Sequence, residues 1–329
     1  MLLATARICM KPAQSLSLTV VLAALMLVGC RGVVTINKPP DPIATKIQAD
    51  TLPRVYLIMF ENQEYEKLIG NPHAPYINSL AQQYAVATNF YANTHPSIGD
   101  YFMITTGSVV TNDLYYASLY DGDNLARLFG QQGITWKAYL ESLPSVGYQG
   151  DRAYPYVKSH NPFAYFSDVH FVAEENASMV PLTQLDSDIS SGALPSFVYI
   201  VPNQQNNMHD CPPDMTTCEN NDKETHGDDW LKQTIAPILA QPSFQKDGLM
   251  IIAWDESWDN DSRHGGGHVP VILVGPNVKS GYQGNTFMQH EALLRLICET
   301  LKIPNSLGAA TTAPSMSDFL VNPPQPTKP

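Results

Sequence analysis

Short apolar runs alternate with amphipathic stretches through most of this chain. Residues 55–60, VYLIMF, are apolar at every position, which is typical of a strand buried on both faces. Comparable runs follow at 197–201, 249–254 and 269–274. Helical patterns occupy 74–84, 228–239 and 291–301. Strands that alternate with helices predict an α/β fold, with a largely parallel central sheet and helices on both faces.

The same pattern predicts one folded domain between two irregular ends. Residues 51–321 contain no internal repeat and no break in composition, so a single domain is the simplest interpretation. Residues 30–50 contain a Pro-Pro-Asp-Pro run, mix polar residues and show no period, which predicts a tether. Residues 322–329 are rich in proline and predict a flexible tail.

The first 29 residues have the order of a bacterial secretory signal. Arg7 and Lys11 precede an apolar stretch at 16–27, which ends in Leu-Val-Gly before Cys30. A cysteine in this position resembles the lipobox of a lipoprotein, in which Cys30 is lipidated and becomes the first mature residue. The alternative is a membrane-spanning helix, but the apolar run is short for a span and no second hydrophobic segment follows it.

We therefore expect an exported bacterial lipoprotein that contacts the membrane only through its N-terminal lipid. An Asp after the lipidated cysteine would resemble the signal for retention in the inner membrane, and this chain has Arg31 there. The predicted location is the outer membrane, facing the periplasm or the cell surface.

The charge balance narrows the range of partners. The chain has 329 residues, with 19 Lys and Arg against 31 Asp and Glu, which gives a formal net charge of −12. This balance argues against a nucleic-acid-binding surface, because contact with a phosphate backbone needs basic residues. An anionic small substrate stays compatible with it, since a bound metal ion reverses the local field of a site.

The cysteines indicate a small covalent loop. Export permits disulfides, and Cys211 and Cys218 lie close enough in the chain to form one. The rival is a metal site, but these cysteines lack the paired close spacing of structural zinc ligands. Cys298 sits in an apolar helical pattern, which predicts a buried thiol.

Oxygen and imidazole groups follow three of the predicted strands. Glu61 and Asn62 come directly after 55–60, Asp255 and Glu256 directly after 249–254, and His209 soon after the run that ends at residue 201. In such sheets the ligand site lies beyond the carboxyl ends of the strands. Converging carboxylates repel one another and are tolerated mainly when a cation is bound. The ordinary alternative is that acids after strands cap helices or face water.

A serine stands at the predicted start of a helix. Pro96 and Ser97 open an amphipathic run that stops at Gly107. The free N–H groups and partial positive charge of a helix N-terminus suit a phosphate. A serine there acts as a nucleophile if a metal or a base withdraws its proton. The alternative for Ser97 is a plain N-cap without a catalytic role.

Taken together, these segments resemble the phosphoesterase family of bacterial acid phosphatases and phospholipases C, within the alkaline-phosphatase-like superfamily. The ordered matches cover nearly all of residues 54–305. They are Phe60-Glu61-Asn62 with Tyr65, Asn71 to Tyr76, His95 to Gly107, His160 to Phe163, Pro195 to Asp210, Gly227 to Leu231, Trp254-Asp255-Glu256, and Gly265 to Pro276. The length of the chain favours the acid phosphatase branch.

The resemblance implies a complete phosphoryl-transfer site. In that family, residues that match Glu61, Asn62, Asp255 and Glu256 hold one divalent cation, and the Ser97 Oγ completes its shell. The resemblance implies that Ser97 forms a phosphoserine intermediate. The predominance of oxygen ligands suits Ca²⁺, Mg²⁺ or Mn²⁺, and nearby histidines keep Zn²⁺ open.

Four further residues are candidates to bind the phosphoryl oxygens or to protonate the leaving group. We assign acid–base roles to His160 and His209, and substrate binding to Asn161 and His268. The structural alternatives are that His160 caps a turn and that His268 only packs before its strand.

The chain departs from the family pattern at two positions. Asp100 stands where the family commonly shows Asn, at a position expected to hydrogen-bond the phosphoryl group. An ionised Asp would repel that group, so Asp100 is protonated, binds a cation or weakens activity. Asn207 replaces a frequent Asp, which weakens the case for a second metal.

Three functions are compatible with these features. The first is a metal-dependent phosphoric monoester hydrolase that acts on a phosphate-ester substrate in the cell envelope. The second is a phosphodiesterase such as a phospholipase C, for which Tyr115, Tyr116, Tyr154 and Tyr156 would supply apolar loops. The third is an envelope lipoprotein with a degenerate, non-catalytic site, for which Asp100 is the main support.

Overall fold

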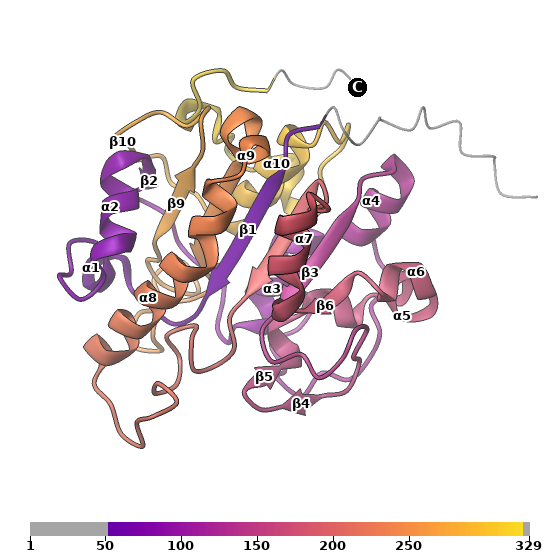
Figure 1. Cartoon of the computed structure of the whole chain (residues 1–329), viewed down its shortest axis with the longest axis horizontal. Helices are drawn as coiled ribbons and strands as arrows, with labels where there is room; N and C mark the ends of the chain where they lie inside the picture. Colours follow the sequence, from indigo (N-terminus) through magenta and orange to yellow (C-terminus); the bar gives the residue numbers. More distant parts are fainter. Residues whose placement is uncertain (1–51, 325–329) are drawn as a thin grey trace, which may run out of the picture. The chain divides into compact units, whose positions relative to one another are not determined.

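A central sheet of eight strands forms the framework of the protein (Figure 1). The computed structural model describes residues 52–324, so the predicted signal, tether and lipidation site lie outside the described residues, as does most of the predicted tail. The strands follow the order β10-β2-β9-β8-β1-β7-β3-β6. Their bounds are β1 Val55–Phe60, β2 Ala85–Ala87, β3 Trp136–Leu140, β6 Met179–Pro181, β7 Phe197–Val201, β8 Leu249–Trp254, β9 Val271–Val274 and β10 Tyr282–Gly284.

The centre of the sheet is parallel, as the sequence predicted. β1 pairs in parallel with both β7 and β8, and β3 pairs in parallel with β7 and β6. β9 instead runs antiparallel to both β8 and β2. The segment between β8 and β9 contains no helix, and without a crossover helix a strand returns most simply as an antiparallel neighbour.

Helices cover both faces of the sheet. In Figure 1, α8 and α9 lie in front of the strands, and α3 and α10 lie behind them. The bounds are α1 Tyr65–Leu68, α2 Pro75–Gln83, α3 Ile98–Thr106, α4 Leu125–Gln132, α5 Ser167–Phe171, α6 Ala173–Asn176, α7 Leu185–Ser191, α8 Asn220–Leu239, α9 Pro242–Asp247 and α10 His290–Thr300. Among residues 52–324, no helix has the length and apolar character needed to cross a membrane.

The helix that follows Ser97 is more deeply buried than its pattern indicated. It ends at Gly107, whose φ of 73° is the left-handed conformation that glycine adopts readily at a helix end. The prediction of an amphipathic helix is wrong, since every residue of α3 is buried. The cause is that α10 packs on one side of α3 while two 3₁₀ turns, Lys158–His160 and Pro162–Tyr165, pack on another.

A small second sheet lies outside the main one. β4 (Arg152–Ala153) and β5 (Tyr156–Val157) form a short antiparallel pair. The first of the two 3₁₀ turns begins directly after β5. This hairpin and the turns therefore carry residues 151–165 past one end of α3.

Candidate active site

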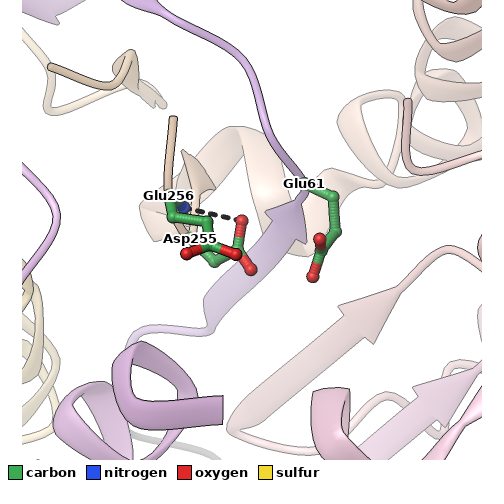
Figure 2. Close-up of side chains that lie close together, drawn as sticks. All are labelled: Glu61, Asp255 and Glu256. Carbon is green, nitrogen blue, oxygen red and sulfur yellow. Dashed lines mark hydrogen bonds between the residues drawn. The ribbon is translucent and has the colours of Figure 1, made fainter. Parts of the chain in front are cut away.

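The register of β1 and β8 brings two acidic segments to one place. Phe60 pairs with Trp254 at the ends of these strands, so Glu61 and Asp255 leave the sheet side by side. Figure 2 shows their carboxylates together with that of Glu256, whose backbone N–H donates to Asp255 Oδ1 at 2.6 Å. All three residues are buried, and one oxygen from each lies within 4.8 Å of the others. The structure thus assembles three of the four predicted metal-binding residues in one cluster.

Asn62, the fourth, lies beside this cluster in an unusual conformation. Its φ of 42° is rare for a residue with a side chain, although asparagine tolerates it better than most. Its backbone N–H points to Asp255 Oδ1 at 3.4 Å. The buried Oδ1 of Asn62 and the buried Oδ2 of Asp255 have no hydrogen-bond partner among the described residues. Buried oxygens without donors are what a cation site needs, so the residues fit a divalent ion.

The pKa shifts within the acidic cluster also favour a bound cation. Burial raises the pKa of Asp255, the charges of Glu61 and Glu256 raise it further, and it lies well above its usual range. Burial also acts to raise the pKa of Glu61, but the neighbouring His160 outweighs this effect and holds that pKa below its usual value. Three ionised carboxylates repel one another here, and a divalent cation would offset that repulsion.

Ser97 lies against these carboxylates at the N-cap of α3. Its Oγ donates to Glu256 Oε1 at 2.7 Å, and its backbone N–H donates to the same oxygen at 3.0 Å. The Oγ also lies 3.4 Å from Glu61 Oε2. The hydroxyl is therefore held by groups from both strand ends. An ordinary N-cap serine accepts a bond from its own helix, whereas Ser97 makes no such cap.

His95 is a site residue that the sequence analysis did not single out. Its Nδ1 contacts Glu256 Oε2, and its Nε2 lies 3.0 Å from the carbonyl oxygen of Asp261. The hydrogen bond to Glu256 is the main reason that the pKa of His95 rises to about 9. His95 therefore holds one oxygen of Glu256 while Ser97 uses the other. Its position two residues before Ser97 is the feature of the sequence that could have identified it.

A glycine segment closes the back of this region. Gly265 and Gly266 pack directly on the chain that leads to Ser97. The Gly266 N–H donates to the Ala92 carbonyl at 3.1 Å, and the Ala92 N–H donates to the Gly267 carbonyl at 2.9 Å. A Cβ on Gly265 or Gly266 would overlap the backbone of Asn93 or Thr94. The backbones can approach this closely only because these residues have no side chains.

His160 lines the cleft and also contacts Glu61, one of the predicted metal-binding residues. Its Nε2 lies 2.6 Å from Glu61 Oε1, and its ring stacks on Tyr101 with centroids 4.9 Å apart. The residue is buried. Its contacts therefore orient Glu61 from one side, as His95 orients Glu256 from another. This geometry favours a positioning role over the acid–base role predicted from the sequence.

His209 faces a cleft that opens onto Ser97. The cleft has a volume of about 410 Å³ and is lined by Glu61, Ser97, Leu114, Tyr115, Asp151, Arg152, Val157, Lys158, Ser159, His160, Tyr165, Gln204 and His209. His209 Nδ1 lies 2.7 Å from Asp210 Oδ1, and its Nε2 has no hydrogen-bond partner among residues 52–324. Burial acts to lower the pKa of His209, but the hydrogen bond with Asp210 and the charge of Glu61 outweigh it and raise that pKa. A protonated nitrogen is thus available at the cleft.

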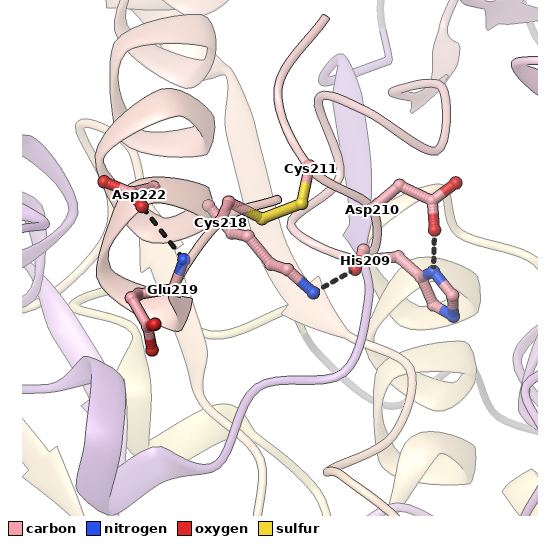
Figure 3. The surroundings of a disulfide bond; sticks show 7 residues. His209, Asp210, Cys211, Cys218, Glu219 and Asp222 are labelled. Atoms are coloured by element: carbon pink, nitrogen blue, oxygen red, sulfur yellow. Dashed lines mark hydrogen bonds and ion pairs between the residues drawn. A yellow bond between two sulfur atoms is a disulfide. The ribbon is translucent and has the colours of Figure 1, made fainter. Parts of the chain in front are cut away.

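A disulfide lies next to His209 along the chain (Figure 3). Cys211 and Cys218 are bonded, and α8 begins two residues after Cys218. From the first turn of α8, Lys223 Nζ donates to the carbonyl oxygen of His209 at 2.6 Å. The covalent loop and this hydrogen bond together tie the His209 segment to the long helix.

The sequence of this chain matches known proteins over most of its length. The phosphoesterase family profile matches residues 67–304. The chain belongs to the phosphoesterase family. It is 27% identical over 308 residues to a phosphatidylinositol-3-phosphatase of Mycobacterium tuberculosis, a match that covers 93% of this chain and 94% of that protein. It is also 27% identical over 275 residues to a probable acid phosphatase of Kluyveromyces lactis, covering 80% of this chain and 61% of the yeast protein.

These relationships fix the class of reaction and the fold. This phosphoesterase is a hydrolase that acts on phosphate esters. It spans about three fifths of the length of the yeast relative. A solved protein of the alkaline phosphatase superfamily from Vibrio parahaemolyticus superposes with a TM-score of 0.51 at 15% identity, covering 75% of this chain and 66% of that one. The predicted alkaline-phosphatase-like fold is confirmed.

In this phosphoesterase, Asp100 is a buried carboxylate with contacts to Asn93 and His290. It is fully buried, and its Oδ1 accepts from the backbone N–H of Asn93 at 2.7 Å and lies 3.0 Å from His290 Nδ1. Burial raises the pKa of Asp100 to about 6 although His290 opposes the shift. A buried histidine that no sequence motif revealed thus engages one oxygen of this carboxylate, and Asp100 Oδ2 has no hydrogen-bond partner among the described residues.

The two predicted substrate-binding residues lie outside the cleft. Asn161 is buried and its Nδ2 donates to the Tyr156 hydroxyl at 3.2 Å. His268 packs between two tyrosine rings, with Nδ1 at 2.9 Å from Glu66 Oε1 and Nε2 at 3.2 Å from the Thr88 carbonyl. Neither residue lines the cleft beside Ser97. For His268 the geometry matches the packing alternative, since both of its ring nitrogens are already engaged.

Proposed function

We propose that this phosphoesterase is a metal-dependent phosphoric monoester hydrolase that works through a phosphoserine on Ser97. The observation that carries the proposal is the position of the Ser97 hydroxyl. It lies 2.7 Å from Glu256 and 3.4 Å from Glu61 within the buried acidic cluster, and it opens onto the cleft. A hydroxyl in this setting has an acceptor for its proton and room for a phosphoryl group beside it.

The residues of the chain divide the work of the first step. Ser97 Oγ attacks phosphorus in line with the leaving oxygen, so that the Oγ–P bond forms as the bond to the leaving group breaks. Glu256 Oε1 orients the hydroxyl through its hydrogen bond and takes the Oγ proton as the Oγ–P bond forms. His209 Nε2 donates a proton to the departing oxygen, and Asp210 holds the ring by its other nitrogen.

The second step reverses these roles. Water attacks the phosphoserine, the Oγ–P bond breaks as Glu256 returns the proton to Ser97 Oγ, and inorganic phosphate leaves. His209, neutral after the first step, takes the proton of that water and is ready for another turnover. The partial positive charge at the N-terminus of α3 would stabilise charge on the equatorial oxygens in both steps.

The acidic cluster supports metal dependence. Glu61, Asn62, Asp255 and Glu256, with Ser97, are the residues that would hold a single divalent ion. Its chemistry would be Lewis-acid stabilisation of the charge on the phosphoryl group and the serine oxygen. Ligands that are all oxygen favour Ca²⁺, Mg²⁺ or Mn²⁺, and Zn²⁺ stays within the proposal.

The preference for monoesters rests on the relatives and on the size of the cleft. The curated relatives reported above carry names of phosphatases, and one of them acts on a phosphoinositide by its name. Phosphodiester cleavage is the competing reaction. Hydrolysis of p-nitrophenyl phosphate compared with that of p-nitrophenyl phosphocholine separates the two.

The location in the cell envelope is part of the same proposal. It rests on the secretory pattern and Cys30 in the sequence, and the Cys211–Cys218 disulfide is compatible with an oxidising compartment. Labelling of Cys30 with a radioactive fatty acid in cells, abolished by Cys30→Ser, would test the lipid anchor.

The decisive test of the enzymatic proposal is Ser97→Ala. We expect the variant to fold, to bind the metal nearly as well, and to lose at least about 10³-fold in kcat on p-nitrophenyl phosphate. Ser108→Ala, just beyond the end of the same helix, is the matched control. Chelation with EDTA should remove wild-type activity reversibly. Wild-type rates from metal-loaded Ser97→Ala would rule out the covalent route.

A further inference from the structure

The cleft beside Ser97 carries two cationic side chains that form no ion pair among the described residues. Arg152 on β4 and Lys158 just after β5 both line it. Neither forms an ion pair among residues 52–324, whereas Arg127, Lys137, Arg263 and Arg295 do. Cationic side chains without an ion pair are unexpected beside this cleft, because the chain has 12 more acidic than basic residues.

We propose that the leaving group of the natural substrate carries its own negative charge, which Lys158 and Arg152 bind. The substrate class is a phosphomonoester whose alcohol bears a carboxylate or a second phosphate. This inference rests on the proposed function and adds a substrate class to it.

Lys158 provides the stronger evidence that the leaving group is anionic. Its side chain is half-buried, with Nζ 4.5 Å from the centre of the Tyr165 ring. Burial lowers the pKa of Lys158, and Asp151 opposes this only from beyond ion-pair distance. A cation removed from water without a partner is costly, and an anionic ligand would supply that partner.

Arg152 supplies the second positive charge at the rim. It is exposed and lies over the Tyr154 ring at 5.9 Å. Asp151 also lines the cleft, so this wall holds two positive charges and one negative charge. The remaining positive charge favours an anion, while a neutral alcohol would leave Lys158 without a counter-charge.

Two matched substrate pairs test the inference on the wild-type enzyme. 3-Phosphoglycerate and glycerol 3-phosphate differ in a carboxylate close to the ester. Fructose 1,6-bisphosphate and fructose 6-phosphate differ in a phosphate farther away. We expect kcat/KM to be about tenfold higher for the anionic member of at least one pair.

Substitutions then assign the effect to the cleft. Lys158→Gln should reduce the preference to within about threefold, Arg152→Gln should reduce it less, and Lys158→Arg should retain it. Asp151→Asn should increase it, a change of opposite sign that a structural role would not produce. Lys279→Gln is the matched control, because Lys279 also lies over a tyrosine ring, at 5.2 Å, but outside the cleft.

The outcomes separate this inference from the proposal on which it rests. Equal kcat/KM within both pairs in the wild-type enzyme would overturn the inference and leave the phosphatase proposal standing. A preference that Lys158→Gln and Arg152→Gln both leave unchanged would overturn it as well. No hydrolysis of any of the four monoesters would overturn the proposed function and this inference together.

Discussion

The wall of the cleft that carries Ser97 and Glu61 is fixed by the ends of β1 and β8, whereas the wall that carries Arg152 and Lys158 is built from a short hairpin and the turn that begins after it. On the first wall, buried carboxylates have defined partners, such as His160 on Glu61 and His95 on Glu256. On the second, Arg152 and Lys158 are partly or fully exposed and have no ion pair. The reaction is therefore built into the framework, and the choice of ester is left to segments that can change without disturbing it.

The largest effect should come from breaking the sheet-built wall at its centre. Glu61→Gln keeps the size of the side chain but removes a charge that offsets a bound cation. We expect a loss of about 10³-fold in turnover of p-nitrophenyl phosphate and a fall in bound divalent metal. Elemental analysis of the purified protein gives the second readout. Glu174→Gln, exposed on α6, is the control, and full metal content in Glu61→Gln would contradict the assignment.

A smaller effect is expected from substitution of His209, which lies in a loop and not at the end of β1 or β8. His209→Gln should lower turnover of glycerol 3-phosphate by about 10²-fold, since an alkoxide leaving group needs a proton. Turnover of p-nitrophenyl phosphate should fall much less, because p-nitrophenolate leaves readily without one. His73→Gln is an exposed control. Equal losses on the two esters would exclude the role of proton donor.

The pH dependence of kcat also tests His209 as the proton donor. The reaction needs protonated His209, and its pKa is raised from the ordinary value. The acid form is thus present below this raised pKa, and kcat should decline as the pH rises through it. The decline should be evident with glycerol 3-phosphate and be absent in His209→Gln. An unchanged alkaline limb in that variant would assign it to another group.

Next in size is the effect of removing a residue that orients a ligand. His160→Phe keeps an aromatic ring to stack on Tyr101 but loses the nitrogen 2.6 Å from Glu61. We expect the affinity for the metal to weaken by about 10- to 100-fold, with kcat largely restored at saturating metal. Metal titration followed by activity measures both. A normal metal affinity with a low kcat would instead support the acid–base role first assigned to His160.

The smallest effect concerns the disulfide beside His209. Replacing Cys211 and Cys218 together by Ser removes the covalent tie beside His209. We expect a loss of about 2 kcal/mol in the free energy of unfolding and a few-fold decrease in kcat, because the loop gains freedom in both states. Urea unfolding and steady-state kinetics check this. A loss as large as that of His209→Gln would mean that the disulfide sets the geometry of the histidine directly.

The residues that could be predicted are those fixed by strand ends. Apolar runs revealed β1, β7 and β8, and polar residues at their carboxyl ends revealed Glu61 and Asp255. The pairing of Phe60 with Trp254 then brings these carboxylates together without help from any other segment. Short strands such as β2 and β10, with three residues each, left no pattern long enough to recognise.

The remaining site residues depend on contacts between distant segments. His290 is 190 positions from Asp100 in the chain, and only the packing of α10 on α3 shows that it holds that carboxylate. His268 lies in a segment that resembles the family pattern, yet its neighbours Glu66 and Tyr91 are not adjacent to it in sequence. The cleft cations were equally hidden, because a missing ion pair cannot be seen along the chain.

The close approach of Gly265, Gly266 and Gly267 to the segment before Ser97 bears on how this enzyme can be redesigned. Random mutagenesis across these three codons should return mostly inactive clones. A larger residue at Gly265 or Gly266 displaces the chain that leads to the nucleophile, and one at Gly267 overlaps Ser257 and Asp261. Libraries aimed at new esters are better directed to Asp151, Arg152, Tyr154 and Lys158, where side chains border solvent and the catalytic framework is untouched.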